Sequence, residues 1–124
     1  MFKFPKKQKL CSEKAIERLF LNGKFISEKP FRAIWCFEEN NDHVFVKSLV
    51  VVSKKRVKLA VKRNSIKRKI KEAYRIHKKQ LEFFLESNNK QLNLAIIYQE
   101  EESLDYIILE QKINLLLIRL INEL

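Results

Sequence analysis

One stretch constrains the fold of this chain more than any other. From residue 58 to residue 86 the apolar residues recur with the period of a helix, and this stretch lies between two strand-like runs. The runs are residues 44–52 (VFVKSLVVV) and residues 92–98 (LNLAIIY), both rich in residues that favour strands. A strand, a long helix and a second strand in succession predict a parallel strand pair bridged by the helix. The apolar arc of that helix comprises Ile66, Ile70, Ala73, Tyr74, His77, Leu81, Phe84 and Leu85.

The N-terminal part of the chain predicts a helix followed by strands. Ser12 is a suitable N-cap for a helix over residues 12–22, and Gly23 can end that helix in the left-handed conformation. Residues 31–38 (FRAIWCFE) predict a strand, and a shorter strand is expected near residues 24–28.

The C-terminal part predicts a last helix from Ser103, as its cap, to about residue 122. A length of 124 residues fits one domain. We therefore expect residues 1–124 to form a single α+β domain, a two-layer sandwich with helices packed on a small mixed sheet. The predicted order is helix, three strands, helix, strand, helix.

Positive charge is concentrated in one part of the chain. Residues 47–80 hold 14 Lys and Arg side chains and one acidic residue, Glu72, within a chain of net charge +11. A solvated helix face normally mixes signs, so this stretch predicts a surface that binds a polyanion. Its cations adjoin the apolar arc of the helix or precede that helix. The candidate polyanion-binding residues are Lys54, Lys55, Arg56, Lys58, Lys62, Arg63, Asn64, Lys67, Arg68, Lys71 and Arg75.

The identity of the polyanion follows from the setting of the basic helix. A membrane-surface helix needs its apolar face free for lipid, whereas a small domain needs that face for its core. A DNA reader is expected to pair the basic helix with another helix across a short turn, but strand-like runs flank this one. The pattern favours an RNA-binding protein. With neither a signal sequence nor a long apolar run in view, we expect a cytoplasmic protein without a membrane partner.

The sequence offers little for catalysis. A single Gly in the whole chain excludes Gly-rich phosphate loops. A two-metal nuclease needs several carboxylates beside the phosphate, and Glu72 stands alone among cations with which we expect it to pair. The Cys and His residues lack the spacing of a zinc site. We therefore assign no catalytic residue, no metal ligand and no bound cofactor to this chain.

Three aromatic residues are candidates for contact with unpaired bases. Phe20, Phe31 and Trp35 can each stack on a nucleotide, which contributes about 1–3 kcal/mol per base. Each can equally belong to the core, and for Phe31 and Trp35 the two interpretations carry the same weight. Ser53, at the end of the predicted central strand, borders the same surface.

The segment KRNSIKRKIKEAYR, residues 62–75, resembles the signature of the protein subunit of bacterial ribonuclease P. The matching positions are Arg63, Asn64, Ile66, Lys67, Arg68 and Glu72. Residues 9–25 resemble the opening helix of that family, and residues 93–98 resemble its strand after the basic helix. Within residues 62–75 two positions depart from the signature: Ser65 stands where many relatives have Arg, and Lys71 replaces the usual Arg.

The resemblance implies a non-catalytic protein cofactor of an RNA enzyme, an endoribonuclease that removes the 5′ leader from precursor tRNA. It implies that the RNA subunit carries out the cleavage with Mg²⁺, and that the protein binds ribonuclease P RNA and precursor tRNA with no obligate protein partner. The basic residues named above would contact the RNA subunit. Phe20, Phe31, Trp35 and Ser53 would line a leader cleft between the first helix and the sheet. The family fold also implies a left-handed crossover between the parallel strands.

Two alternatives use the same charge. A structural RNA-binding protein of the ribosomal type would bind RNA without serving an enzyme. A DNA-binding regulator is the weaker alternative, because the helix pair that it would need is not evident.

Overall fold

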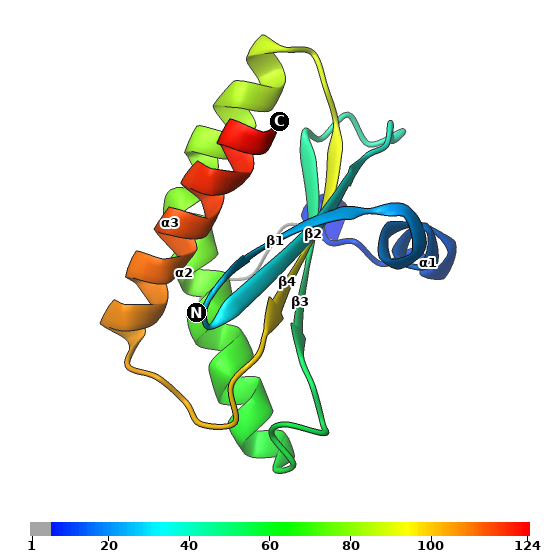
Figure 1. Cartoon of the computed structure of the whole chain (residues 1–124). Helices are drawn as coiled ribbons and strands as arrows, with labels where there is room; N and C mark the ends of the chain where they lie inside the picture. Colours follow the sequence, from blue (N-terminus) through cyan, green and yellow to red (C-terminus); the bar gives the residue numbers. More distant parts are fainter. Residues whose placement is uncertain (1–5) are drawn as a thin grey trace.

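Residues 6–124, the part of the chain that the computed structural model describes, form a four-stranded mixed sheet with helices on both faces (Figure 1). The elements are η1 (Lys6–Gln8), α1 (Glu13–Asn22), β1 (Lys24–Glu28), β2 (Phe31–Phe37), β3 (Val46–Val52), α2 (Ala60–Ser87), β4 (Leu92–Tyr98) and α3 (Tyr106–Glu123). The strands lie in the order β1-β2-β4-β3. Strand β2 pairs antiparallel with both β1 and β4, and β3 pairs parallel with β4. The predicted α+β class, element order and mixed sheet are confirmed.

Helix α2 bridges the two parallel strands. It carries the chain from the end of β3 back to the start of β4, as the strand, helix and strand pattern predicts. Seen from the helical side with both strands pointing upward, β4 lies to the left of β3 (Figure 1). The crossover is therefore left-handed, as the resemblance implies, although most crossovers between parallel strands have the opposite hand.

The main core lies between the sheet and the pair of helices α2 and α3. Every second residue of a strand faces this layer, among them Phe31, Ala33 and Trp35 of β2. One polar pair is buried here: the Ser48 hydroxyl donates to the Tyr74 hydroxyl at 2.7 Å, and burial raises the pKa of Tyr74. Helix α2 buries six residues of its predicted apolar arc: Ile66, Ile70, Ala73, Tyr74, Leu81 and Leu85. Within the described chain, no helix combines the length and apolar character needed to cross a bilayer.

Helix α1 covers part of the other face of the sheet, so the helices enclose the sheet from both sides instead of forming only two layers (Figure 1). Ala15 and Leu19 of α1 pack against Ala95 of β4 in a second, smaller core. An ion pair fixes this helix to the sheet, because Arg18 donates to the Glu38 carboxylate at 2.9 and 3.0 Å. The hydrogen bond from Arg18 lowers the pKa of Glu38.

The helix ends confirm one sequence prediction and correct two. Ser12 caps α1, because its hydroxyl accepts from the Ala15 amide. Gly23 follows α1 with φ −69°, not in the left-handed conformation. A Cβ at Gly23 would lie 2.4 Å from the Leu19 carbonyl oxygen, so close packing is what requires glycine. Helix α3 begins at Tyr106. Ser103, the expected cap, lies in the loop before α3, where its hydroxyl accepts from Lys69 of α2.

Candidate nucleic-acid interface

The loop from β3 to α2 is held as a tight turn by its first residue. The Ser53 hydroxyl accepts from the Lys55 amide at 3.1 Å, and the Val57 amide donates to the Ser53 carbonyl at 2.9 Å. Val57 is buried in the main core and anchors the turn. The side chains of Lys54, Lys55 and Arg56 are therefore exposed at the end of the sheet where α2 begins.

Several predicted RNA-binding cations already have partners in the protein. The Arg63 guanidinium donates to the carbonyls of Val57 and Lys58 at 3.0 and 2.9 Å, and so closes the turn onto α2. Arg56 donates to the Gln99 carbonyl at 2.9 Å. These arginines therefore support the shape of the loop as well as its charge.

Two further cations are paired with carboxylates. Lys62 contacts Glu102 at 2.8 Å, across the start of α2. Arg75 contacts Glu72 at 2.5 and 3.1 Å, and this hydrogen bond lowers the pKa of Glu72. The expectation that Glu72 pairs with a neighbouring cation is confirmed.

The other predicted residues keep their side chains available. Their side chains make no hydrogen bond or ion pair to any residue in the 6–124 range. The N-cap of α2, Leu59, provides no side-chain hydrogen bond either, which leaves amides of the first turn open toward an anion. We call this set of side chains the free basic surface: Lys54, Lys55, Lys58, Asn64, Lys67 and Arg68.

Lys71 is a half-buried cation close to two other cations. Burial, together with the charges of Lys9 and Lys67, lowers the pKa of Lys71. Lys9 reaches this place because the N-terminal segment pairs with the edge of the sheet, where the Leu10 amide donates to the Ser48 carbonyl at 3.0 Å. Sequence analysis missed Lys9 as a site residue, and the basic N-terminal segment was the only signal for it.

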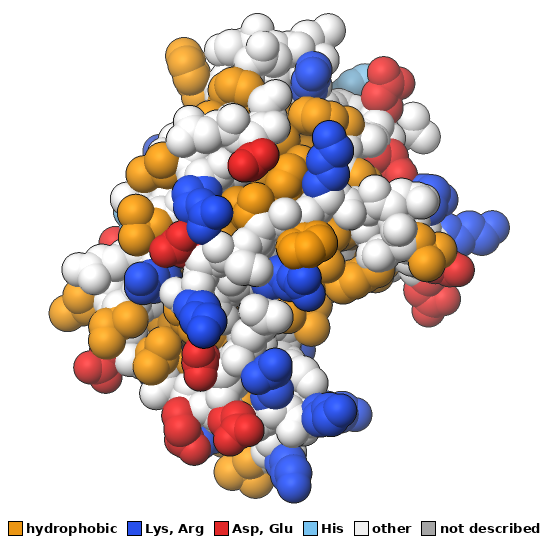
Figure 2. Space-filling view, viewed as in Figure 1, with side chains coloured by type: hydrophobic (Ala, Val, Ile, Leu, Met, Phe, Trp, Pro, Cys, Tyr) orange, Lys and Arg blue, Asp and Glu red, His pale blue; other side chains and the backbone are white. Residues whose placement is uncertain are grey.

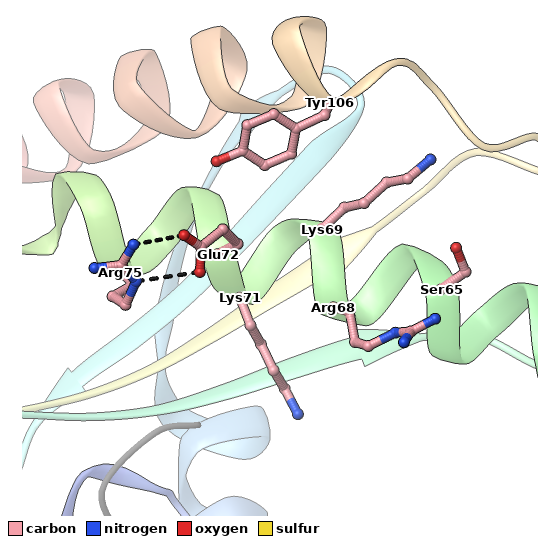
Figure 3. A pocket seen from close by; sticks show the side chains of 7 residues that line it. All are labelled: Ser65, Arg68, Lys69, Lys71, Glu72, Arg75 and Tyr106. Atoms are coloured by element: carbon pink, nitrogen blue, oxygen red, sulfur yellow. Dashed lines mark hydrogen bonds and ion pairs between the residues drawn. The ribbon is translucent and has the colours of Figure 1, made fainter. Parts of the chain in front are cut away.

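A cavity of about 690 Å³ opens on the same helix (Figure 3). Its lining residues come from α2 except for Tyr106, which belongs to α3, and burial raises the pKa of Tyr106. Figure 2 shows further Lys and Arg side chains gathered at the end of the molecule where α2 begins. The predicted cations are thus held along one helix and the loop that precedes it, with room for a bulky anionic group. The cavity is lined by Ser65, Arg68, Lys69, Lys71, Glu72, Arg75 and Tyr106.

The aromatic candidates separate into two groups. Phe31 and Trp35 are 0% and 4% exposed in the main core, and Phe31 packs against Tyr98 with ring centroids 5.7 Å apart. Buried rings offer no face to a nucleotide, so the leader-binding prediction for Phe31 and Trp35 is wrong. Phe20, on α1, is 44% exposed and can still meet a base.

The face of the sheet that carries α1 is only partly covered. Helix α1 packs on Ile34, Ala95 and Leu49, which lie side by side on adjacent strands. The next row across the same face stays half-buried or exposed, and its β3 member lies two residues before Ser53. We call this row the outer row: Ser27, Arg32, Ile97 and Val51.

The fold and these surfaces define a class of protein: a small α+β protein with a crossover helix that presents cations along one edge. Comparison with known proteins gives the family. Residues 4–120 match the family described as Ribonuclease P. The ribonuclease P protein component of Porphyromonas gingivalis strain ATCC 33277 is 30% identical over 119 residues, which cover 96% of this chain and 87% of that protein. The chain belongs to the ribonuclease P protein family.

Solved structures agree on the fold. The ribonuclease P protein of Staphylococcus aureus matches with a TM-score of 0.69 at 21% identity, covering 91% of this chain and 94% of that one. The ribonuclease P protein of Thermotoga maritima matches with a TM-score of 0.68 at 20% identity, covering 94% and 96%.

Proposed function

We propose that this chain is the protein cofactor of ribonuclease P and promotes removal of the 5′ leader from precursor tRNA. In this proposal the free basic surface binds ribonuclease P RNA, together with Lys71 and the engaged cations Arg56, Lys62, Arg63 and Arg75. The RNA subunit carries out phosphodiester cleavage with Mg²⁺, and no side chain of this protein takes part in the chemistry. The complex acts in the cytoplasm and requires no other protein.

The leader belongs to the face of the sheet that carries α1. Phe20 of α1 offers an exposed ring, and Ser53 follows β3, the last strand of the outer row. A single strand that lies along this row ends beside Lys54 and Lys55, whose charges attract its phosphates.

The observation that carries the proposal is the free basic surface in a chain of this family. Five cations that have no hydrogen-bond or ion-pair partner among residues 6–124 lie within 15 residues, from Lys54 to Arg68. Neighbouring cations repel one another, which destabilises the free protein. A bound polyanion offsets this repulsion.

The test combines the purified chain with a bacterial ribonuclease P RNA and a precursor tRNA at low Mg²⁺. We expect the chain to increase the rate of 5′ cleavage, and the chain alone to cleave nothing. The variant Lys67→Gln/Arg68→Gln tests the free basic surface directly. It removes two free cations and should lose most of the stimulation. Tight RNA binding without any stimulation would instead favour a structural RNA-binding protein.

A further inference from the structure

Arg32 is a charged residue in the middle of an otherwise uncharged row. It lies on β2 opposite Ser27 of β1 and Ile97 of β4, and Val51 of β3 follows Ile97. These positions form the outer row, which α1 leaves uncovered. A strand position of this kind ordinarily holds an apolar or neutral side chain, so the guanidinium there calls for an explanation.

The guanidinium of Arg32 has no polar partner in the described chain. Its Nε atom is fully buried and makes no hydrogen bond to residues 6–124. Its central carbon lies 4.0 Å from the centroid of the Phe25 ring, which is itself 57% exposed. This cation–π contact holds the guanidinium against the Phe25 ring, but it does not supply a counter-ion. A partly buried charge without a counter-ion destabilises the free protein.

The acidic residue of the same hairpin is committed elsewhere. Glu28 contacts Arg119 at 2.8 Å and Lys112 at 3.9 Å, both on α3. Glu28 lies opposite Phe31 in the register, so its side chain belongs to the helical side of the sheet, whereas Arg32 belongs to the other side. Glu28 therefore does not neutralise Arg32, whose guanidinium stays available to an anion from outside the protein.

The surroundings indicate a chain of phosphates as that anion. The outer row runs from Arg32 across Ile97 to Val51, and β3 then continues through Ser53 into the free basic surface. Adjacent strands are about 4.8 Å apart, so the row extends for roughly 14 Å from β1 to β3. Arg32 on β2 and the free basic surface beyond β3 place cations on either side of the uncharged Ile97 and Val51, which suits an extended single strand whose bases contact the apolar part.

We propose that Arg32, braced by the Phe25 ring, binds a phosphate of the 5′ leader as the leader crosses the outer row. Arg32 is then a binding residue that sets the affinity for precursor tRNA with a leader, and it makes no contact with the RNA subunit. A planar fork held on a ring can donate two parallel hydrogen bonds to one phosphate. The inference rests on the proposed function, since it requires leader binding on this face.

The experiment uses the assembled complex and compares two precursor tRNAs, one with a long leader and one with a single-nucleotide leader. For Arg32→Met we expect the affinity for the long-leader substrate to fall about tenfold, with the short-leader substrate unaffected. The salt dependence of long-leader binding should become shallower by about 0.7, the value for one phosphate contact on a single strand. Arg32→Lys keeps the charge, so it should lose less affinity and keep the slope.

A thermal unfolding measurement separates this role from a structural one. Because Arg32 has no polar partner in the part of the chain that the structure describes, Arg32→Met should leave the Tm of the free chain unchanged or raise it. Lys24→Gln is the control. It also removes one positive charge from the hairpin, but Lys24 lies on the face of β1 opposite to Phe25.

Three results would overturn the inference: an unchanged long-leader affinity in Arg32→Met, an equal loss for both substrates, or the same loss in Lys24→Gln. A wild-type complex that binds both substrates equally would contradict leader binding in the proposed function, and the inference with it. A wild-type complex that prefers the long leader while Arg32→Met retains that preference would contradict the inference alone.

Discussion

Replacing Lys67 and Arg68 with Gln should weaken the binding of ribonuclease P RNA without weakening the fold. Both side chains belong to the free basic surface, so the substitution breaks no hydrogen bond or ion pair within the described chain. Gln is a good helix former, and we expect the free energy of unfolding to change by less than about 0.5 kcal/mol.

The expected loss of affinity follows from two phosphate contacts. Each contact between a cation and a phosphate contributes about 0.9 to the slope of log affinity against log salt on a duplex, so the double variant should flatten the slope by about 1.8. At low salt the loss should approach roughly 100-fold, since one charge-assisted hydrogen bond is worth about tenfold or more. The assay is a titration of labelled RNA with protein at several salt concentrations.

Two other substitutions set the limits of this prediction. Lys112→Gln removes a cation from α3, outside the free basic surface, and should leave both the affinity and the slope unchanged. Arg63→Gln should weaken RNA binding and also lower Tm, because Arg63 donates to two loop carbonyls. An unchanged slope in the Lys67→Gln/Arg68→Gln variant would show that these side chains meet no phosphate and would refute the reasoning.

Further substitutions test the fold and the leader surface. Trp35→Ala should cost about 3–5 kcal/mol of stability in a urea titration, whereas Phe20→Ala should cost less than about 1 kcal/mol and weaken long-leader substrate binding; similar stability losses would contradict their different burial. Gly23→Ala should cost about 1–3 kcal/mol by the same titration, because its Cβ would press on backbone, and a neutral result would mean that α1 can shift. The lowered pKa of Glu38 stabilises the fold above the ordinary carboxyl pKa, and this contribution is lost as pH falls through the lowered value. The Tm difference between wild type and Glu38→Gln should therefore shrink from neutral to acid pH, and a constant difference would show that ionisation of Glu38 is not responsible.

The sequence alone determined the order of the elements, because hydrophobic periodicity and local caps act over short distances. The β4 bounds, the helical period of α2 and the parallel pairing across it could all be predicted, and so could the concentration of cations beside the apolar arc of α2. The residues of α2 that resemble the family signature lie on the helix faces that the helical period predicts, because a helix fixes the angle between its side chains.

Tertiary structure decided which side of each strand became core. Alternation in β2 separates Phe31 and Trp35 from Arg32, but both sides carry apolar residues, and the pattern does not say which side the long helices cover. Packing of α2 and α3 on the side of Phe31 buried both aromatic candidates and left Arg32 on the outer row. Distant partners likewise decided which cations remain free, since Lys62 meets Glu102 and Lys9 approaches Lys71 only after the chain has folded.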